Sequence, residues 1–361
     1  MIKRRPTISH LTPYVPGKPI EEVKRELGIQ KVIKMASNEN PLGCSPAAKK
    51  AVAGMLDHLE IYPDGNCTEL RAKISDLFGL PPEHFLFGAG SDEILGLIAQ
   101  TYINPEDEAI MAYPSFPRYE TVTRVMDGKP VQVPLKNHTL DLEGMARAIT
   151  PKTKVIWLCN PNNPTGTIYT AAQQRELLEK TPPNVLVVLD EAYYEYVIDD
   201  DYPESVALLE EYPNIIILRT FSKIYGLAAL RVGYAIGHPD MISDINRVRG
   251  PFNVNTASQV AALASLDDPD FVERSRQNNE QGKEYLYKAF ESMGLEYIKT
   301  HGNFVMVDTG RHSKDVFHDL LRMGIIVRTA DIFDMDTWLR VTISTPEENR
   351  EFIEALQKVL R

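Results

Sequence analysis

Cysteine is scarce in this chain of 361 residues, which contains only Cys44, Cys67 and Cys159. An odd number of widely separated cysteines supports neither a disulfide framework nor a zinc knuckle, so we interpret the three as packing residues. The eight histidines also avoid the H-E-x-x-H pattern and other spacings typical of metal ligands. We therefore predict no metal site.

Long apolar runs and an excess of positive charge are absent as well. No stretch approaches the roughly 20 apolar residues of a membrane span, and Lys3, Arg4 and Arg5 are not followed by the apolar segment of a secretion signal. Lys and Arg number 39 against 50 Asp and Glu, a formal net charge of −11. Because nucleic-acid-binding surfaces are basic, we expect a cytoplasmic protein that binds neither nucleic acid nor membrane.

The composition that is present, 43% hydrophobic and 25% charged residues, is that of a globular protein. A chain of this length exceeds the size at which one core usually stops growing, so we expect two domains that share a cleft. The sequence suggests a proline-rich N-terminal arm (1–35) that packs with the small domain, a large domain (36–250) and a small C-terminal α+β domain (251–361).

The large domain is predicted from short apolar runs that are typical of buried strands. Helix-like stretches such as 171–180 separate several of these runs, which lie at 85–87, 109–111, 155–159, 185–189, 215–218 and 232–236. Continuously apolar strands that alternate with helices indicate an α/β fold with a mainly parallel sheet, covered by helices on both faces.

In such a sheet, ligands bind beyond the carboxyl ends of the strands, and polar motifs follow several of the predicted strands. The turn Gly88–Glu93 offers backbone N–H groups and a helix N-terminus to an anion. A dinucleotide-binding turn would require glycine at position 93, where this chain has glutamate. We therefore interpret the turn as a phosphate site.

The other strand ends supply aromatic, amide, acidic and basic groups. These are the aromatic run 113–119, the amide-rich loop 160–166, Asp190 with Tyr193, and Ser222-Lys223 followed by Arg231. On its own Lys223 would be read as an ordinary surface charge. Together the groups suit pyridoxal phosphate, which needs a phosphate cradle, a ring stack, an acid opposite the pyridine nitrogen and a Schiff-base lysine.

With these motifs the sequence resembles the fold-type-I pyridoxal-phosphate aminotransferases, and within them the histidinol-phosphate aminotransferases. The resemblance extends through nearly the whole chain. It rests on Tyr14–Lys18, Ala36–Pro41, Tyr62–Gly65, Gly90–Glu93, Asn160–Gly166, Asp190–Tyr193, Thr220–Lys223 with Arg231, and Leu339–Thr342.

The resemblance implies a role for each residue around the cofactor ring. Lys223 would bind the cofactor covalently and then move the proton from the substrate's α-carbon. Asp190 would pair with the pyridine nitrogen, Asn163 and Tyr193 would contact the 3′-oxygen, and Phe116 would lie over the ring. The catalytic residues would thus be Lys223, Asp190 and Tyr193.

Further residues would hold the cofactor's phosphate group. The resemblance assigns this role to the backbone amides of Ser91 and Asp92 together with Ser222 and Arg231. Tyr62 would reach the phosphate from the partner subunit, so the site would need a homodimer. A lysine that acts as a base must be partly neutral near pH 7, and burial together with Arg231 would lower the pKa of Lys223.

The substrate residues implied by the resemblance are Arg340, which would grip the anionic group, with Arg328, Tyr14 and Asn163. The implied reaction is a ping-pong transamination of L-histidinol phosphate with 2-oxoglutarate, giving imidazole-acetol phosphate and L-glutamate in histidine biosynthesis. One segment departs from the family pattern, because residues 331–336 between the two arginines contain three aspartates. Carboxylates near an anion site would weaken binding unless they face solvent.

Three other functions stay open at the level of sequence. An aromatic amino-acid aminotransferase would use Arg340 for a carboxylate and an aryl ring in place of imidazole. A pyridoxal-phosphate-dependent lyase or decarboxylase would share the cofactor site but form no glutamate. A non-catalytic binding module is disfavoured because Lys223 and Asp190 are both in place.

Overall fold

The computed structural model describes residues 2–11, 13 and 17–361, so Tyr14 lies outside the described residues. The described part of the chain forms a seven-stranded sheet in the order β2-β8-β7-β6-β5-β3-β4. These strands are β2 (Phe85–Gly88), β3 (Glu108–Tyr113), β4 (Lys129–Pro134), β5 (Thr153–Cys159), β6 (Leu186–Asp190), β7 (Ile215–Thr220) and β8 (Gly233–Gly237). We call this sheet and its helices the large domain.

Most neighbouring strands of the large sheet are parallel. The pairs β4/β3, β3/β5, β5/β6 and β6/β7 run in the same direction, whereas β8 is antiparallel to both β7 and β2. The edge strand β4 was missed by the sequence analysis. Its apolar residues alternate with polar ones and its prolines, Pro130 and Pro134, are tolerated at a sheet edge.

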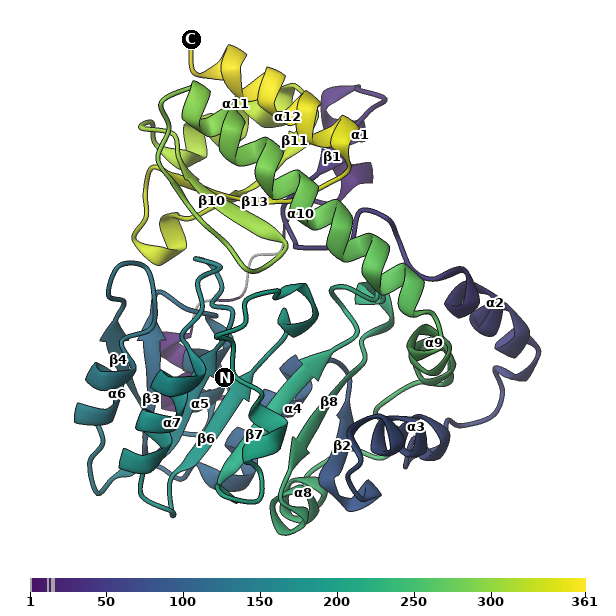
Figure 1. Cartoon of the computed structure of the whole chain (residues 1–361), viewed down its shortest axis with the longest axis vertical. Coiled ribbons are helices and arrows are strands. Elements are labelled where there is room, and N and C mark those ends of the chain that lie inside the picture. The colour runs from purple at the N-terminus through teal and green to yellow at the C-terminus, as the bar shows by residue number, and fades with distance from the viewer. Residues whose placement is uncertain (1, 12, 14–16) are drawn as a thin grey trace.

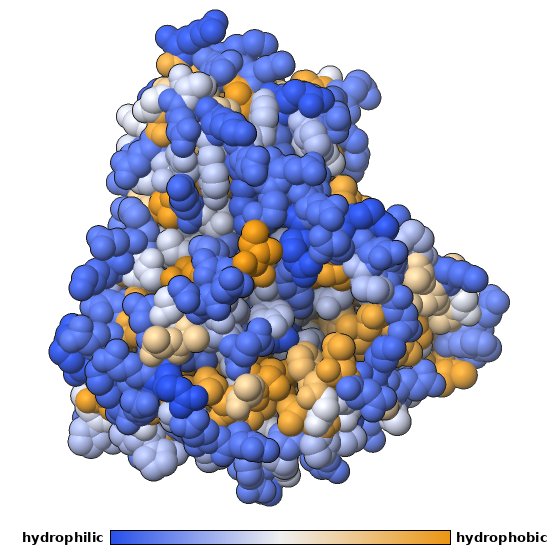
Figure 2. Space-filling model, in the orientation of Figure 1, coloured by the Kyte–Doolittle hydropathy of each residue, from blue (hydrophilic) through white to orange (hydrophobic). Residues whose placement is uncertain are grey.

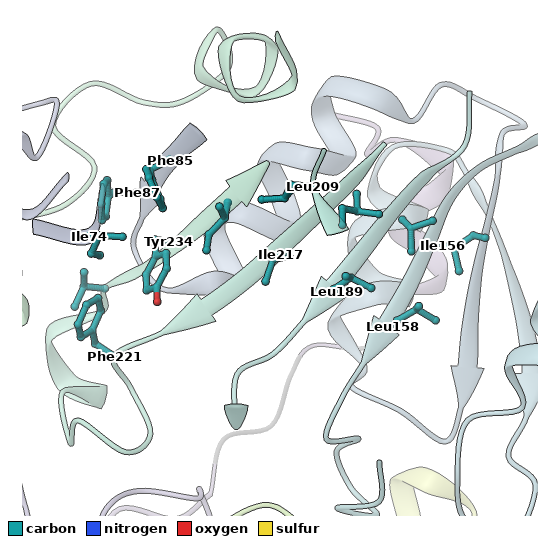
Figure 3. Packing of buried hydrophobic residues seen from close by; sticks show 14 of the residues in the cluster. Ile74, Phe85, Phe87, Ile156, Leu158, Leu189, Leu209, Ile217, Phe221 and Tyr234 are labelled. Carbon is teal, nitrogen blue, oxygen red and sulfur yellow. The ribbon is translucent and has the colours of Figure 1, made fainter. Parts of the chain in front are cut away.

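Helices cover both faces of the large sheet because successive strand side chains point to opposite sides (Figure 1). Ile215 and Ile217 face one core, whereas Ile216 and Leu218 face the other. The first core, part of which Figure 3 shows, includes α2 (Pro46–Met55), α3 (Thr68–Phe78), α6 (Leu142–Arg147), α7 (Ala171–Lys180) and α9 (Thr256–Leu266). The second includes α4 (Ser91–Tyr102), α5 (Arg118–Val125) and α8 (Pro239–Asn246).

A smaller unit, the small domain, lies above the large sheet in Figure 1 and is joined to it by the long helix α10 (Pro269–Ser292). Its antiparallel sheet has the order β12-β13-β10-β9. The elements are β9 (Tyr297–Ile298), β10 (Phe304–Asp308), β12 (Arg328–Thr329), β13 (Trp338–Thr342), α11 (Ser313–Arg322) and α12 (Pro346–Val359). The two units confirm the predicted α/β fold with a smaller α+β domain.

The N-terminal segment contacts both units. Strand β1 (Ile33–Lys34) pairs in parallel with β11 (Ile325–Ile326), and α1 (Ile20–Leu27) packs through Val23 in the same region. The short helix η1 (Pro6–His10) instead lies against α5 of the large domain, where Arg5 forms an ion pair with Asp127 at 2.7 Å. The segment boundaries at residues 35 and 250 stay predictions.

The remaining short elements are 3-10 helices: η2 (Leu56–His58), η3 (Pro82–His84), η4 (Tyr194–Tyr196), η5 (Ser205–Leu208), η6 (Ala228–Leu230) and η7 (Asp331–Phe333). None of the helices in the described residues combines the length and the apolar character that a membrane span requires. Figure 2 shows apolar residues interrupting the hydrophilic surface below the small domain, over the part of the large sheet that holds β7 and β8.

Candidate active site

A cavity of about 270 Å³ opens where the ends of the large-domain strands face the small domain. It brings together most of the residues that the sequence singled out: Ser91, Asp92, Phe116, Asn163, Asp190, Tyr193, Ser222, Lys223, Arg231, Arg328 and Arg340. Tyr62 does not line it, and Tyr14 lies outside the described residues. The expectation that ligands bind beyond the carboxyl ends of the strands therefore identified residues from distant parts of the chain that line one cavity.

Lys223 extends from the segment after β7 into this cavity. Its Nζ donates a hydrogen bond to the carbonyl oxygen of Ser37 at 3.3 Å. The cavity gives the side chain some solvent contact, but the surrounding protein excludes most water, and this burial lowers the pKa of Lys223 to about 8. The positive charge of Arg340 lowers it further, more than Arg231 does, while Glu39 acts in the opposite direction.

The turn after Lys223 depends on glycine at position 226. The Gly226 N–H donates to the carbonyl of Lys223 at 3.0 Å, and its φ of +69° lies in the left-handed region that favours glycine. A Cβ at this position would lie 1.7 Å from the carbonyl oxygen of Gly43. A residue with a side chain would therefore displace the segment that carries the lysine.

Asp190 is the last residue of β6 and is almost fully buried. Its Oδ2 accepts a hydrogen bond from the Tyr119 hydroxyl at 2.8 Å, whereas its Oδ1 is buried with no hydrogen-bond partner among the described residues. Burial raises the pKa of Asp190 to about 6, and the hydrogen bond from Tyr119 opposes that rise. A buried acceptor oxygen on a cavity-lining carboxylate suits a protonated ring nitrogen.

Tyr193 and Asn163 are held by neighbouring polar side chains. The Asn38 amide nitrogen donates to the Tyr193 hydroxyl oxygen at 2.9 Å, and burial raises the pKa of Tyr193, so its hydroxyl remains a proton donor. The Arg340 guanidinium donates to the side-chain oxygen of Asn163 at 2.6 Å. An amide whose oxygen is engaged in this way offers its nitrogen as a donor to a ring oxygen.

An anion cradle forms where the N-terminus of α4 meets Arg231. The first helical residues are Ser91–Asp92, and Gly90 before them has a φ of +79°. A Cβ on Gly90 would lie 2.6 Å from the Arg231 guanidinium, so glycine allows the cation to approach the turn. Arg231 also donates to the Ser222 hydroxyl oxygen at 3.3 Å. Helix N–H groups, a hydroxyl and a guanidinium together suit a phosphate.

Two further residues of this cavity wall, Asp92 and Phe116, contact residues of α5. The Asp92 carboxylate accepts a hydrogen bond from Arg118 at 2.5 Å, and this pairing compensates its negative charge beside the anion cradle. The Phe116 ring meets the Tyr119 ring edge to face, with centroids 5.7 Å apart. The cavity thus has an aromatic wall next to Asp190.

The cationic end of the cavity comes from the small domain. Arg328 and Arg340 lie directly opposite each other on the antiparallel strands β12 and β13. Arg340 also donates to the carbonyl oxygen of Ala36 at 2.8 Å, which ties it to the N-terminal segment. Two guanidinium groups at one end of a cavity can bind a phosphate or a carboxylate.

The aspartates between these arginines do not line the cavity, which receives Ile332 and Phe333 from the same segment. Asp331 forms an ion pair with Lys314 at 2.8 Å, and Asp334 accepts a hydrogen bond from the Tyr113 hydroxyl at 2.7 Å. Asp336 is exposed. The departure from the family pattern therefore adds an apolar wall to the cavity and leaves its positive charge in place.

Several cavity residues were missed by the sequence analysis. Ser37, Asn38 and Glu39 line the cavity and belong to a motif that supported the family resemblance, but no local pattern assigned them a role. Tyr119, which does not line the cavity but donates to the cavity residue Asp190, lies in the aromatic run 113–119. Phe116 precedes α5, so the aromatic run itself was the only available signal for Tyr119.

The cavity residues fit pyridoxal phosphate. The orphaned Oδ1 of Asp190 can accept the ring N–H, and the Gly90 turn with Arg231 can take the phosphate. Lys223 lines the same cavity, so its amine is available to an aldehyde. A group with a protonated ring nitrogen, an aldehyde and a phosphate would satisfy all three.

Comparisons with known proteins agree with this assignment. Residues 30–356 match the family described as aminotransferase class I and II. A histidinol-phosphate aminotransferase of Caldicellulosiruptor saccharolyticus is 54% identical over 356 residues, which cover 99% of each chain. Another, of Moorella thermoacetica, is 54% identical over 359 residues, covering 99% of this chain and 93% of that relative.

A solved structure is also close. The crystal structure of histidinol-phosphate aminotransferase from Sinorhizobium meliloti, in complex with pyridoxal-5′-phosphate, superposes with a TM-score of 0.93 at 26% identity. The match covers 100% of this chain and 98% of that one. These findings confirm the resemblance that the sequence motifs indicated, and the chain belongs to the class I and II aminotransferase family.

Proposed function

We propose that this protein catalyses the pyridoxal-phosphate-dependent transamination of L-histidinol phosphate with 2-oxoglutarate, giving imidazole-acetol phosphate and L-glutamate. The observation that carries the proposal is one cavity that is lined by Lys223 and Asp190 and also by the paired arginines Arg328 and Arg340. The relatives that are 54% identical bear the name of this activity. This reaction belongs to histidine biosynthesis, and a cytoplasmic location stays a prediction from the sequence.

Each residue around the cofactor has a chemical task in this proposal. When bound, pyridoxal phosphate supplies an electron-withdrawing ring that makes the proton on the substrate's α-carbon acidic. Asp190 would hold the ring nitrogen through Oδ1, Tyr193 and Asn163 would hold the ring oxygen, and Phe116 would cover the ring. Lys223, which lines the same cavity, would act on the α-carbon proton.

Lys223 is the base in this proposal. Its Nζ accepts the proton from the α-carbon and returns a proton to the adjacent position, which requires a neutral amine before each transfer. A pKa of about 8 supplies a useful neutral fraction near pH 7. The phosphate of the cofactor would be held by Ser91, Asp92, Ser222 and Arg231.

The two arginines of the small domain are proposed to select the substrate. Arg328 and Arg340 would bind the phosphate of histidinol phosphate in one half-reaction and a carboxylate of 2-oxoglutarate or glutamate in the other. Asn163 and Tyr14 are proposed to contact the same substrates. Because the aspartates of the 331–336 segment do not line this cavity, they offer no direct repulsion to the substrate phosphate.

The experiment that tests the substrate compares donors in the presence of 2-oxoglutarate. We expect kcat/KM for L-histidinol phosphate to exceed that for phenylalanine or tyrosine by more than about tenfold, because a phosphate engages a guanidinium pair more strongly. L-Histidinol, which lacks the phosphate, is the matched control. A preference for phenylalanine or tyrosine would overturn this substrate, and loss of donor without equimolar glutamate would indicate a lyase.

We also propose a homodimer in which Tyr62 completes the partner's phosphate site. Tyr62 is 78% exposed, stacks on Phe252 with centroids 4.8 Å apart, and lies beside the exposed residues Leu59 and Ile61 at the edge of the large domain. An exposed aromatic and aliphatic cluster of this kind favours burial against another protein surface.

Mixing two defective variants tests this dimer. Lys223→Ala removes the base and Tyr62→Ala weakens the phosphate site. After the two proteins are mixed and exchange subunits, a site with Tyr62 supplied in trans regains both residues, so activity should rise well above either parent. Activity that stays at the sum of the parents would contradict the trans arrangement.

A further inference from the structure

Among the described residues, Tyr119 is the buried phenol whose hydroxyl contacts the carboxylate of Asp190. It is 1% exposed, and its hydroxyl donates to Oδ2 of Asp190 at 2.8 Å. Its ring lies parallel to Trp157, with centroids 5.7 Å apart and 7° between the planes, and meets Phe116 edge to face. Tyr119 therefore connects Asp190, which would face the ring nitrogen, to Phe116, which would cover the ring.

The position of Tyr119 is determined by packing on several sides. Trp157 supports the flat face of its ring, and the indole N–H of Trp157 donates to the Thr123 hydroxyl oxygen at 3.3 Å. The Thr123 hydroxyl donates in turn to the carbonyl oxygen of Tyr119 at 2.8 Å. A phenol held in this way cannot rotate freely, so its hydroxyl has a fixed direction.

A fixed donor determines where the second carboxylate oxygen points. Because both oxygens belong to one planar group, engaging Oδ2 of Asp190 through Tyr119 fixes the orientation of Oδ1. Oδ1 is the oxygen without a hydrogen-bond partner in the described part of the chain. The arrangement thus presents one defined acceptor toward the cofactor instead of a carboxylate that turns between two partners.

The hydrogen bond also affects the charge of Asp190. Burial favours the neutral acid and raises the pKa of Asp190, whereas the donor from Tyr119 stabilises the carboxylate and lowers it. Burial and the nearby carboxylate raise the pKa of Tyr119 itself, so the shared proton stays on the phenol. The negative charges of Glu191, the next residue in the chain, and of Asp92 on α4 oppose the ionisation of Asp190, whereas the positive charge of Lys223 favours it.

We propose that Tyr119 is a positioning residue that directs Oδ1 of Asp190 at the cofactor's ring nitrogen and keeps the carboxylate ionised, so that the ring nitrogen retains its proton. The inference rests on the pyridoxal-phosphate function proposed above and assigns Tyr119 no contact with the substrate. Without the phenol hydroxyl, Asp190 becomes more basic, and the proton moves from the ring nitrogen to the carboxylate.

The test uses the holoenzyme with pyridoxal phosphate labelled with ¹⁵N at the ring nitrogen. In Tyr119→Phe, which removes only the hydroxyl, the ¹⁵N chemical shift should move toward that of an unprotonated ring. The affinity for pyridoxal phosphate should fall about tenfold or more, because the charge-assisted hydrogen bond between an ionised Asp190 and a protonated ring nitrogen would be lost. Tyr202→Phe is the matched control, since the Tyr202 hydroxyl donates to the Asn160 carbonyl oxygen at 2.5 Å. That variant should leave the ¹⁵N shift unchanged.

A second variant keeps the inference testable if Tyr119→Phe does not fold. Placing 3-fluorotyrosine at position 119 preserves the ring and the hydroxyl but makes the hydroxyl a stronger donor. The ring nitrogen should then stay protonated to higher pH than in the wild type. A wild-type ¹⁵N shift with wild-type cofactor affinity in Tyr119→Phe, or a ring-nitrogen titration unchanged from the wild type in the 3-fluorotyrosine protein, would overturn the role of Tyr119 alone. A wild-type protein that binds no pyridoxal phosphate would overturn the proposed function together with this inference.

Discussion

Lys223 should capture pyridoxal phosphate with a pH dependence set by its cavity. Only the neutral amine attacks the cofactor aldehyde, so the capture rate follows the neutral fraction. Lowering the pKa from the usual 10.5 to about 8 raises that fraction at pH 7 from about one in three thousand to about one in eleven, roughly a 300-fold gain. Below about pH 7 the rate should rise close to tenfold per pH unit, the rise should weaken as the pH approaches 8, and well above pH 8 the rate should level off.

The assay mixes ligand-free protein with pyridoxal phosphate in a stopped-flow instrument and follows the absorbance of the lysine-bound cofactor. Lys223→Ala, which cannot form that bond, gives the background. A rate that continues to climb tenfold per unit through pH 9 and 10 would refute the reasoning, because it would mean that the cavity leaves the amine with an ordinary pKa.

Two variants with opposite effects sharpen this test. Arg340→Gln removes a positive charge that lowers the pKa of Lys223, so the pH at which the rate levels off should rise. Glu39→Gln removes a negative charge that raises the same pKa, so the plateau should begin at lower pH. Shifts in the same direction for both variants would contradict the electrostatic explanation.

Three further predictions concern stability and substrate binding. Arg219→Leu breaks a buried ion pair with Glu191, in which both side chains are 3% exposed, and should lower the free energy of unfolding in urea by about 3–5 kcal/mol. Gly226→Ala should lower the free energy of unfolding by more than about 1 kcal/mol, because alanine disfavours the left-handed backbone at this position, and urea unfolding measures this loss. The same variant should lose bound cofactor, which the cofactor's absorbance reports. Asp336→Asn should leave KM for histidinol phosphate within about twofold, whereas Ile332→Asp, whose side chain lines the cavity, should raise it more than about tenfold in steady-state assays.

Each of these predictions has a control or an outcome that would contradict it. Replacing both Arg219 and Glu191 by leucine should cost less than Arg219→Leu, because no unpaired charge stays buried. Gly250→Ala should be nearly neutral, since a Cβ there meets nothing within 4 Å. Equal destabilisation by Gly226→Ala and Gly250→Ala would contradict the claim that the turn after Lys223 requires glycine. Equal effects on KM at positions 332 and 336 would contradict the finding that Ile332 lines the cavity and Asp336 does not.

Much of the fold could be predicted because buried parallel strands have a strong sequence signal. The runs 155–159 and 215–218 are apolar without interruption, as both faces of the sheet are covered. The edge strand β4 lacked this signal, since it pairs with β3 alone and most of its side chains are not fully buried. Its prolines also argued against a strand in the sequence, although proline is excluded only where a strand has neighbours on both sides.

The site was predictable to the extent that it is formed by strand ends. Asp190 directly follows an apolar run, and Lys223 and Asn163 lie in the loops after two others, so their shared location required only the rule that parallel strands end at one edge. Asn38 and Arg340 reach the same cavity through long-range contacts, such as the hydrogen bond from Asn38 to Tyr193. No local pattern reports which surface of a second domain will close on that edge, so only the resemblance pointed to Arg340.

The pairing of Arg328 with Arg340 has a consequence for how this enzyme could change over evolutionary time. Backbone hydrogen bonds between β12 and β13 hold the two guanidinium-bearing residues opposite each other, whatever residues occupy the connection between them. That connection can therefore gain, lose or exchange residues while the grip on an anion persists. Selection acting on residues 331–336 could retune which substrates are accepted without first dismantling the chemistry that makes any of them react.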